Sequence, residues 1–301
     1  MHIIGHHKER KRLERLVRED SISQGYLFVG PESVGKSFCA LAFASELVSE
    51  PDFVPTTDKP YPFDVRVITP QEETKRSVTK QKNIGVDEIR EALLFLGQFP
   101  IHGKYRVIII EDAHKLSSSA QNVLLKTLEE PNPSAVIILV THQIGNIIPT
   151  ILSRIERVRF SYVSPEDMQS GLASVVERNK ETVIAPFFFT LGRPGMILRL
   201  LSHPEKFVGE QEKLSRLFRL TSLSLGERLV LAEELAKNVP ETIHLLEWWL
   251  PGLYRQALKG ENIPQTKRFF LLLETVEQAL SLLRNTQSNA RLLLEKLFLS
   301  L

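Results

Sequence analysis

The sequence predicts an α/β domain built on a parallel sheet, followed by a long helical region. Two continuous apolar runs, residues 106–110 and 135–140, have the composition of strands that are buried on both faces of a parallel sheet. Helical segments alternate with the strands, which is typical of a sheet with helices on both sides. After about Ser161, leucine-rich segments with helical spacing continue and no strand pattern recurs.

The elements before residue 161 follow from local patterns. Apolar residues at helical spacing predict helices, and short apolar or alternating runs predict strands. In chain order we expect a helix at 7–19, strand 26–29, helix 38–48, strand 64–69, helix 86–99, strand 106–110, helix 117–130, strand 135–140 and strand 157–160. Prolines interrupt residues 50–63, and the polar stretch 71–83 lacks periodicity, so we expect it to be exposed and mobile.

The later elements are all predicted to be helices. They cover residues 165–178, 185–191, 195–201, 206–220, 226–237, 240–258, 265–283 and 290–299. Pro251, followed by Gly252, is expected to kink or split the helix at 240–258, because proline lacks the amide N–H of a helical hydrogen bond. The change of pattern predicts three domains, an α/β domain at 1–162, a small helical domain at 163–204 and a helical bundle at 205–301.

Composition excludes several classes of protein. Of the 301 residues, 43% are hydrophobic and 25% are charged, as in ordinary globular proteins. No apolar stretch reaches the roughly 18–20 residues of a membrane helix, and the N-terminus lacks a signal-peptide core. Cys39 is the one cysteine, which excludes an internal disulfide and a cysteine-ligated zinc cluster. We therefore expect a cytoplasmic protein with no membrane contact and no zinc.

Charge leaves one question open. The net charge of +2 is too balanced to indicate nucleic-acid binding. The first predicted helix is nevertheless strongly basic, with Lys8, Arg10, Lys11, Arg12, Arg15 and Arg18. This face is either simply solvated or directed toward phosphates.

Residues 30–37 match the phosphate-loop pattern G-x-x-x-x-G-K-[ST], between a predicted strand and a predicted helix. Gly30 and Gly35 let the backbone curl so that its N–H groups, with the N-terminus of the next helix, can hold a phosphate. In this position Lys36 would reach the terminal phosphates and Ser37 would ligate Mg²⁺. The candidate phosphate-binding residues are Gly30, Ser33, Val34, Gly35, Lys36 and Ser37.

Two acids, Glu111 and Asp112, follow the strand at 106–110. The carboxyl ends of the strands are where ligands bind in open α/β sheets. One acid can hold Mg²⁺ through its water shell, and the other can orient or deprotonate an attacking water. An acidic pair after a strand is weak evidence alone, and a solvated turn is the alternative, but here the pair follows a phosphate loop.

Polar residues also close the strand at 135–140 and the helix at 117–130. Thr141 and His142 at the strand tip either position water or are ordinary tip residues. Glu129 and Glu130 end the helix, where the helix dipole disfavours negative charge. The pair therefore either serves a contact or is tolerated on the surface.

Together these segments resemble the bacterial DNA polymerase III clamp-loader subunits, within the AAA+ ATPases. The resemblance rests on the phosphate loop, the acidic strand end, the string LLKTLEEP at residues 124–131 and the string ILSR at residues 151–154. It covers about the first 200 residues. It implies an AAA+ parallel sheet with flanking helices, a small helical lid at 163–204 and an all-helical collar domain at 205–301 that holds a five-subunit ring together.

The resemblance also implies cofactors, partners and roles. ATP and Mg²⁺ would be bound, and the partners would be other clamp-loader subunits, the sliding clamp and primed DNA. Lys36 and Ser37 fall on the nucleotide-binding pair, Glu111 on the Mg²⁺-linked acid and Asp112 on the water-activating acid. The usual order is aspartate then glutamate, so this chain has the two swapped, and the shorter Asp112 is expected to misplace the water and slow hydrolysis.

Three further positions carry roles by resemblance. His142 falls on the first sensor, with Thr141 adjacent. Arg154 falls on the arginine finger, which acts in trans on a neighbouring subunit's ATP. Ile4, with its neighbours Ile3 and Gly5, resembles the segment that lies against adenine.

Two departures indicate which subunit the chain resembles most. The motor subunit has a four-cysteine zinc module that this chain lacks, although many delta-prime subunits have one too. The motor subunit also has an arginine at the second sensor, where this chain has Gly195 in the string GRPG at residues 192–195. This favours a delta-prime-like subunit with weak or no ATPase activity alone. The alternatives are an active motor-like (gamma/tau-type) ATPase and a non-catalytic scaffold with a vestigial nucleotide site.

Overall fold

The computed structural model describes most of the chain. The described residues are 3–50, 61–75, 78–81, 83–130, 132–178, 192–202, 212, 216–217, 219–259, 263–285 and 289–300. The chain divides into two compact units, one within residues 1–173 and 192–195 and the other within residues 174–191 and 196–301. The finer division into three domains stays a prediction.

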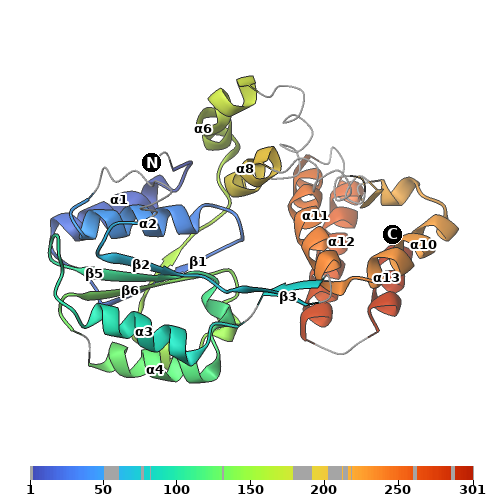
Figure 1. Ribbon diagram of the computed structural model, residues 1–301. Coiled ribbons are helices and arrows are strands. Elements are labelled where there is room, and N and C mark those ends of the chain that lie inside the picture. Colours follow the sequence, from blue (N-terminus) through green and yellow to red (C-terminus); the bar gives the residue numbers. More distant parts are fainter. Residues whose placement is uncertain are drawn as a thin grey trace. The chain divides into compact units, whose positions relative to one another are not determined.

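A five-stranded sheet forms the centre of the first unit (Figure 1). All of its strand pairs are parallel, and the strand order is β2-β5-β6-β1-β7. The strands are β1 (Gly25–Val29), β2 (Val65–Ile68), β5 (Arg106–Ile110), β6 (Ala135–Thr141) and β7 (Glu156–Arg159). Every residue of β5 and β6 is buried, which confirms the prediction of central strands covered on both faces.

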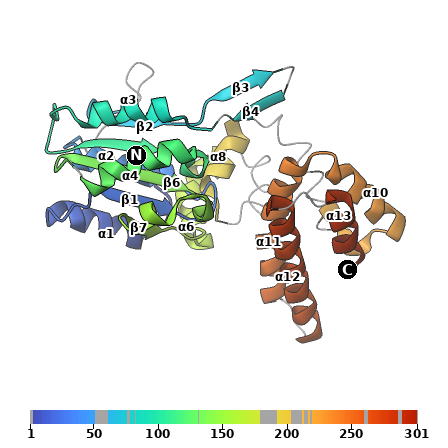
Figure 2. The same ribbon diagram turned by 90° about the horizontal axis from the view of Figure 1, so that it is seen from below.

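Helices cover both faces of this sheet (Figures 1 and 2). Helices α1 (His7–Arg18) and α2 (Lys36–Leu47) pack on one face, and α3 (Val86–Leu96) and α4 (Ser118–Glu129) on the other. Alternate residues of one strand serve the two cores, since Tyr26 and Phe28 of β1 pack with α2 while Leu27 packs toward α3 and α4. Fully burying a side chain of this kind stabilises the fold by about 1.5–3 kcal/mol.

Helix α3 ends at Leu96, earlier than the predicted end at residue 99, because the following segment turns back onto a buried carboxylate. Asp64 is fully buried and accepts hydrogen bonds from the backbone N–H groups of Ile101, at 2.9 and 2.8 Å, and His102, at 2.6 Å. The guanidinium of Arg106, also buried, lies 3.1 Å from the same carboxylate. These contacts fix the segment that leads from α3 into β5.

Residues 71–83 contain structure that the sequence analysis missed. Strands β3 (Glu72–Lys75) and β4 (Val78–Gln81) pair antiparallel, with Glu73 opposite Lys80 and Thr74 opposite Thr79. The absence of periodicity thus did not reveal these strands, and the expectation that the segment is exposed and mobile stays a prediction. The paired residues are mostly polar, so the pairing leaves little apolar periodicity along the sequence.

The other elements are shorter or belong to the helical part. Short helices η1 (Ala113–Lys115), η2 (Ile144–Asn146) and α5 (Pro149–Leu152) lie around the ends of the strands. Beyond the sheet, the described helices are α6 (Pro165–Arg178), α8 (Pro194–Ser202), η3 (Leu220–Ser222), α10 (Leu225–Ala236), α11 (Val239–Lys259), α12 (Ile263–Asn285) and α13 (Ala290–Leu299). The predicted helix at 185–191, and most of the one at 206–220, lie outside the described residues.

The second unit has its own apolar core between α10, α11, α12 and α13. Its largest buried side chains include Trp249 and Phe298. Helix α11 runs without a break through Pro251, so the expectation of a split was wrong, while the alternative of a kink stays a prediction. One proline removes a single N–H donor, and the helices packed along α11 hold the remaining turns in place. No helix in the described ranges is both long and apolar enough to cross a membrane.

Candidate functional site

Three adjacent strands end at the candidate site. In the sheet order β5, β6 and β1 are consecutive, the phosphate loop follows β1, the acidic pair follows β5, and Thr141 is the last residue of β6. Parallel strands share one carboxyl edge, so these segments meet there. Ser37 of the loop side is hydrogen-bonded to Glu111, and His142 lies 4.0 Å from Asp112.

The loop backbone needs its two glycines for different reasons. A Cβ atom on Gly30 would lie 2.2 Å from the carbonyl oxygen of Phe160, so no side chain fits there. Gly35 has a φ of 109° and open space around its Cβ position, so conformation rather than packing requires glycine. Ser33 also has a positive φ, 61°, which is the kind of backbone strain found at ligand-binding sites.

Lys36 is folded into the loop. It is 6% exposed, and its Nζ donates to the carbonyl oxygens of Gly30 at 2.9 Å and Pro31 at 2.5 Å. Burial lowers the pKa of Lys36 to about 8, although nearby carboxylates, Glu32 first among them, work to raise it. The ammonium group can therefore exchange its two carbonyl partners for phosphate oxygens, which would restore a full countercharge.

Ser37 and Glu111 form the second contact of the site. The Ser37 hydroxyl donates to Glu111 Oε2 at 2.6 Å. Burial raises the pKa of Glu111, and this hydrogen bond partly offsets the rise. A hydroxyl and a carboxylate side by side are the oxygen ligands that Mg²⁺ prefers, directly or through water.

Asp112 is engaged by basic neighbours. It has left-handed backbone angles, φ 47° and ψ 44°, and its Oδ2 lies 2.8 Å from Lys115 Nζ. Burial works to raise the pKa of Asp112, but the hydrogen bond and charge of Lys115, together with His114 and His142, outweigh burial and lower it. A carboxylate held in this way is a poorer proton acceptor than a free one.

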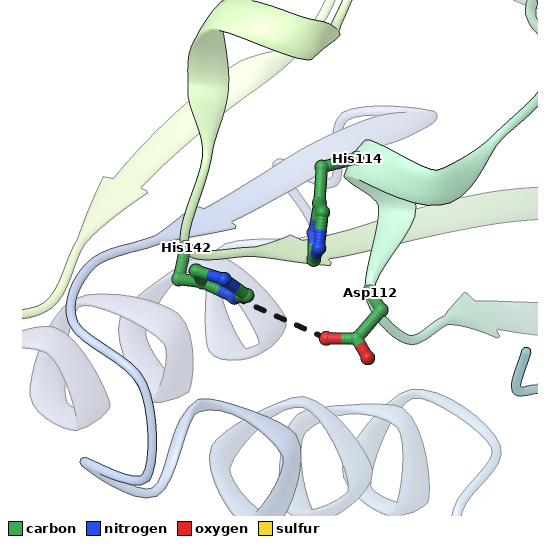
Figure 3. Close-up of side chains that lie close together, drawn as sticks. All are labelled: Asp112, His114 and His142. Atoms are coloured by element: carbon green, nitrogen blue, oxygen red, sulfur yellow. Dashed lines mark ion pairs between the residues drawn. The ribbon is translucent and has the colours of Figure 1, made fainter. Parts of the chain in front are cut away.

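Two histidines pack beside Asp112 (Figure 3). The rings of His114 and His142 meet edge to face, with centroids 4.3 Å apart. Burial, followed by the charge of His142, lowers the pKa of His114 to about 4, and burial also lowers the pKa of His142. The Thr141 hydroxyl lies 3.2 Å from His114 Nδ1. Both imidazoles are therefore neutral at pH 7, and they form one polar cluster with Asp112.

The N-terminal segment contacts the phosphate loop through His6. His6 is buried, and its Nε2 lies 2.9 Å from the carbonyl oxygen of Val34, so Val34 presents its backbone to His6. Ile4 is half-buried and packs on helix α6, because a Cβ atom on Gly171 would lie 2.6 Å from the Ile4 side chain. An adenine contact for Ile4 stays a prediction.

The segment 192–195 lies directly on the phosphate loop. The N–H of Gly195 donates to Ser33 O at 2.9 Å, and a Cβ atom on Gly195 would lie 3.1 Å from that oxygen. Arg193 is 5% exposed, and its Nη2 donates to the Tyr162 hydroxyl at 3.1 Å. Within the described residues its Nε has no hydrogen-bond partner, and its charge is among those that act on Lys36.

Arg154 lies in an exposed ion pair. Its Nη2 is 3.0 Å from Glu129 Oε1, and its Nη1 donates to the carbonyl oxygen of Thr150 at 3.0 Å. Both charged side chains are more than a third exposed, so the pair contributes only about 0–1 kcal/mol. Glu129 thus has the contact that the sequence left open, and Arg154 can exchange it for another anion.

Sequence reasoning missed three residues near the loop and the acids, namely His114, Lys115 and Arg193. For His114 and Lys115 the available signal was their place directly after the acidic pair. For Arg193 no local signal was available, because arginine side chains are usually exposed. Their contacts depend on strand order and on chain reversal, which local patterns do not carry.

The described residues fit a phosphate group with a divalent cation. The space around Gly35 is open, the Lys36 ammonium group is already held inside the loop, and Ser37 and Glu111 present paired oxygens. The arrangement can therefore bind a polyphosphate and orient it at the strand ends.

The sequence matches one known protein family over most of the α/β domain. The family model described as DNA polymerase III, delta subunit, matches residues 5–164, which is more than half of the chain. The chain belongs to this family of DNA polymerase III clamp-loader subunits, within the AAA+ proteins. The match includes all five strands of the parallel sheet, the phosphate loop, the acid–histidine cluster and Arg154. The predicted AAA+ sheet with flanking helices is thereby confirmed.

Curated relatives agree with the family match but are longer. The chain is 30% identical to DNA polymerase III subunit tau of Bacillus subtilis over 175 residues, which is 58% of this chain and 31% of the relative. It is 29% identical to DNA polymerase III subunit delta' of Haemophilus influenzae over 137 residues, 46% of this chain and 41% of the relative. The matches thus span less than half of either relative.

One solved structure aligns over nearly the whole chain. It is a DNA polymerase III gamma subunit-related protein from Thermotoga maritima, with 21% identity, coverage of 95% of this chain and 97% of that one, and a TM-score of 0.43.

Proposed function

We propose that this protein is a delta-prime-like subunit of the DNA polymerase III clamp loader. In this role it binds ATP with Mg²⁺, hydrolyses it slowly or not at all on its own, and works with other clamp-loader subunits in a five-subunit cytoplasmic assembly that loads the sliding clamp onto primed DNA. The observation that carries the proposal is the family match over residues 5–164, which contains a complete phosphate loop.

ATP binding is supported by the loop. Lys36 would exchange the carbonyl oxygens of Gly30 and Pro31 for the terminal phosphates, and the backbone of residues 30–35 would supply N–H donors. Mg²⁺ would be held by Ser37, with Glu111 acting through the bound water shell. The bound cation would neutralise phosphate charge, and the residues of this chain would position the nucleotide.

Weak hydrolysis is supported by the surroundings of Asp112. The carboxylate is paired with Lys115, its pKa is lowered, and it is one methylene shorter than the glutamate usual in the family. No arginine occupies position 195, where a side chain would press on the carbonyl oxygen of Ser33. The first-sensor role of His142 and Thr141 stays part of the proposal, and both side chains lie in the same cluster.

A role for Arg154 in trans is supported by its exposure. Its partner Glu129 is itself 44% exposed, so a phosphate of a neighbouring subunit could replace that carboxylate at low cost. A planar guanidinium donates two parallel hydrogen bonds to phosphate oxygens, which lysine does not do. We propose that this contact accelerates hydrolysis by the neighbour.

The helical bundle is proposed to be the collar of the assembly. Its helices keep apolar side chains outside the core, including Val230, 62% exposed, Leu271, 63% exposed, and Leu292, 61% exposed. Charged replacement of Leu271 should weaken assembly with the other subunits while leaving the core around Leu246 intact. Size-exclusion chromatography of mixed subunits would measure this.

An active motor-like subunit is the second candidate. One observation favours it, namely the match to a tau subunit over 58% of this chain. ATP turnover by the lone chain separates it from the delta-prime-like role. Calorimetry with ATP separates both from a scaffold with a vestigial site.

The experiment that tests the proposal is reconstitution of the assembly with Arg154→Ala. ATP binding by the isolated variant should match the wild type, while ATPase and clamp loading by the assembly should fall by about 10³-fold at the site that Arg154 serves. Arg159→Ala, on strand β7, is the matched control, because Arg159 is exposed and should change neither rate. Clamp loading at the wild-type rate by Arg154→Ala would refute the finger role.

A further inference from the structure

We propose that Asp112, His114 and His142 form a binding site for a divalent transition-metal ion, with Zn²⁺ the best fit, in the nucleotide-free protein. Each residue offers one ligand atom, and these atoms all lie within 4.8 Å of one another. The side chains come from the ends of β5 and β6 and from η1, and they converge in one place (Figure 3). This site is distinct from the Ser37–Glu111 oxygen pair.

The ligand set selects the metal. Two imidazole nitrogens and one carboxylate oxygen suit Zn²⁺, with water completing the coordination, whereas Mg²⁺ prefers oxygen ligands throughout. Ligand atoms around tetrahedral zinc are about 3.4 Å apart, given bonds of about 2.0–2.2 Å. His142 Nδ1 lies 4.0 Å from Asp112 Oδ1. Side-chain adjustments of roughly 1 Å therefore close the site.

The Thr141 hydroxyl orients His114 for this role. Its oxygen accepts from the N–H of Gln143 at 3.0 Å and lies 3.2 Å from His114 Nδ1 and 3.3 Å from the carbonyl oxygen of Gln143. When the hydroxyl proton points to that carbonyl oxygen, the hydroxyl oxygen accepts from His114 Nδ1–H. In that tautomer the lone pair of His114 Nε2 is available for a metal.

The Gln143 amide nitrogen lies 3.1 Å from His142 Nε2, while its carbonyl oxygen accepts from Asn146 Nδ2 at 3.4 Å. Metal binding through His142 Nδ1 requires this amide to turn over, so that its carbonyl oxygen accepts from His142 Nε2–H. His142 Nδ1, on the side that faces Asp112, is then the metal ligand. Each imidazole thus has a partner for the ring nitrogen that does not bind metal, as metal-binding histidines usually have.

Asp112 can bind a metal without losing its ion pair. Oδ1 is the atom nearest His142, while Oδ2 holds Lys115 at 2.8 Å. Lys115 then supports the ligating carboxylate from its far side. The sequence-based expectation of no zinc rested on the single cysteine, and this proposal departs from it.

The test is Zn²⁺ titration of the full-length chain in the absence of nucleotide, against a chromophoric chelator, after removal of metal with EDTA. The wild type should bind one Zn²⁺ that His114→Ala and His142→Ala each weaken by about 100-fold. Thr141→Val, which removes the hydroxyl but keeps the shape, should weaken binding by about tenfold. Zn²⁺ should also raise the thermal midpoint of the wild type and not that of His114→Ala.

Two controls make the outcome decisive. His7→Ala removes a different histidine that lies 3.2 Å from an aspartate, Asp167, and should bind Zn²⁺ as the wild type does. Lys36→Ala should lose ATP and keep Zn²⁺, so failure of the nucleotide proposal leaves this one standing. His142→Gln serves as a second variant if His142→Ala does not fold. Equal Zn²⁺ affinity in the wild type and both histidine variants would overturn the proposal, as would absence of Zn²⁺ binding by the wild type.

Discussion

The phosphate loop and the acid–histidine cluster lie at the ends of adjacent strands, but they are built differently. In the loop, open space surrounds the Cβ position of Gly35. The present partners of Lys36 and Ser37, two backbone carbonyls and Glu111, are ones that a phosphate or a cation can replace. In the cluster, Asp112 is paired with Lys115 and the two histidines pack ring to ring.

This difference means that ATP binding and ATP hydrolysis would depend on different parts of the proposed site. Binding depends on a contiguous stretch of backbone and one lysine, and all of its parts are present. Hydrolysis needs a carboxylate placed to activate water, and Asp112, to which we assign this role, is short, has a lowered pKa and is paired with Lys115. The proposed function therefore combines nucleotide binding with slow or absent turnover at one edge of the sheet.

Of the substitutions considered, Lys36→Ala should have the largest effect, because it should remove most of the affinity of the loop for ATP. It removes the one ammonium group inside the loop, so ATP affinity measured by calorimetry should fall at least about 100-fold, as a lost charge-assisted contact of about 3 kcal/mol implies. Lys104→Ala is the control, because Lys104 lies on the surface in a pair with Asp20. Wild-type affinity in Lys36→Ala would mean that ATP binds elsewhere.

The pH dependence of ATP affinity should be nearly as large. The pKa of Lys36 is lowered to about 8 in the free protein, so the amine is charged below pH 8 and neutral above it, and phosphate binds the charged form. Affinity should therefore fall about tenfold as pH rises from 7 to 9, with proton uptake on binding. Lys36→Arg should bind with little pH dependence over this range, since arginine stays charged. A flat profile for the wild type would contradict the assignment.

Exchanging Glu111 and Asp112 should increase ATP hydrolysis and so test the role proposed for Asp112. The double variant Glu111→Asp and Asp112→Glu restores the family's usual order and lengthens the second carboxylate by one methylene. ATP turnover by the lone chain should rise roughly fivefold, a modest gain because Lys115 and the histidines remain. Asp112→Asn is the control and should gain nothing.

Gly195→Ala should have the smallest effect of these substitutions on ATP binding. The new methyl group would lie 3.1 Å from the carbonyl oxygen of Ser33, so the loop must shift by a few tenths of an ångström. ATP affinity should fall about twofold, since small displacements of phosphate donors cost little. Gly226→Ala on helix α10, where nothing lies within 4 Å of the added carbon, should leave affinity unchanged.

Local patterns were sufficient for much of the fold. The strand at 106–110, the helix at 165–178 and the helix at 290–299 have the predicted bounds, because apolar runs and helical spacing directly reflect burial. The β3–β4 hairpin was missed because its pairing joins polar residues across strands. The helix through Pro251 was expected to kink or split, and it is continuous because tertiary packing, which local rules do not include, holds its turns in place.

The site was predictable only in part for a similar reason. The phosphate loop is a contiguous motif, so both its residues and the helix that follows it could be predicted from one stretch of sequence. The partners of Asp112 come from a short helix and a neighbouring strand, and Arg193 reaches the loop region from far along the chain. These contacts depend on the order of the strands in the sheet and on how the chain folds back, neither of which can be predicted from local sequence patterns.

The most direct test of the contrast between the two regions is to measure ATP binding and ATP turnover on one preparation of the lone chain with Mg²⁺. The account predicts a saturable calorimetric signal that Lys36→Ala abolishes, together with turnover below about 1 s⁻¹, the low end of ordinary enzymes. Absence of binding, or turnover within the range of about 1–10³ s⁻¹, would contradict it.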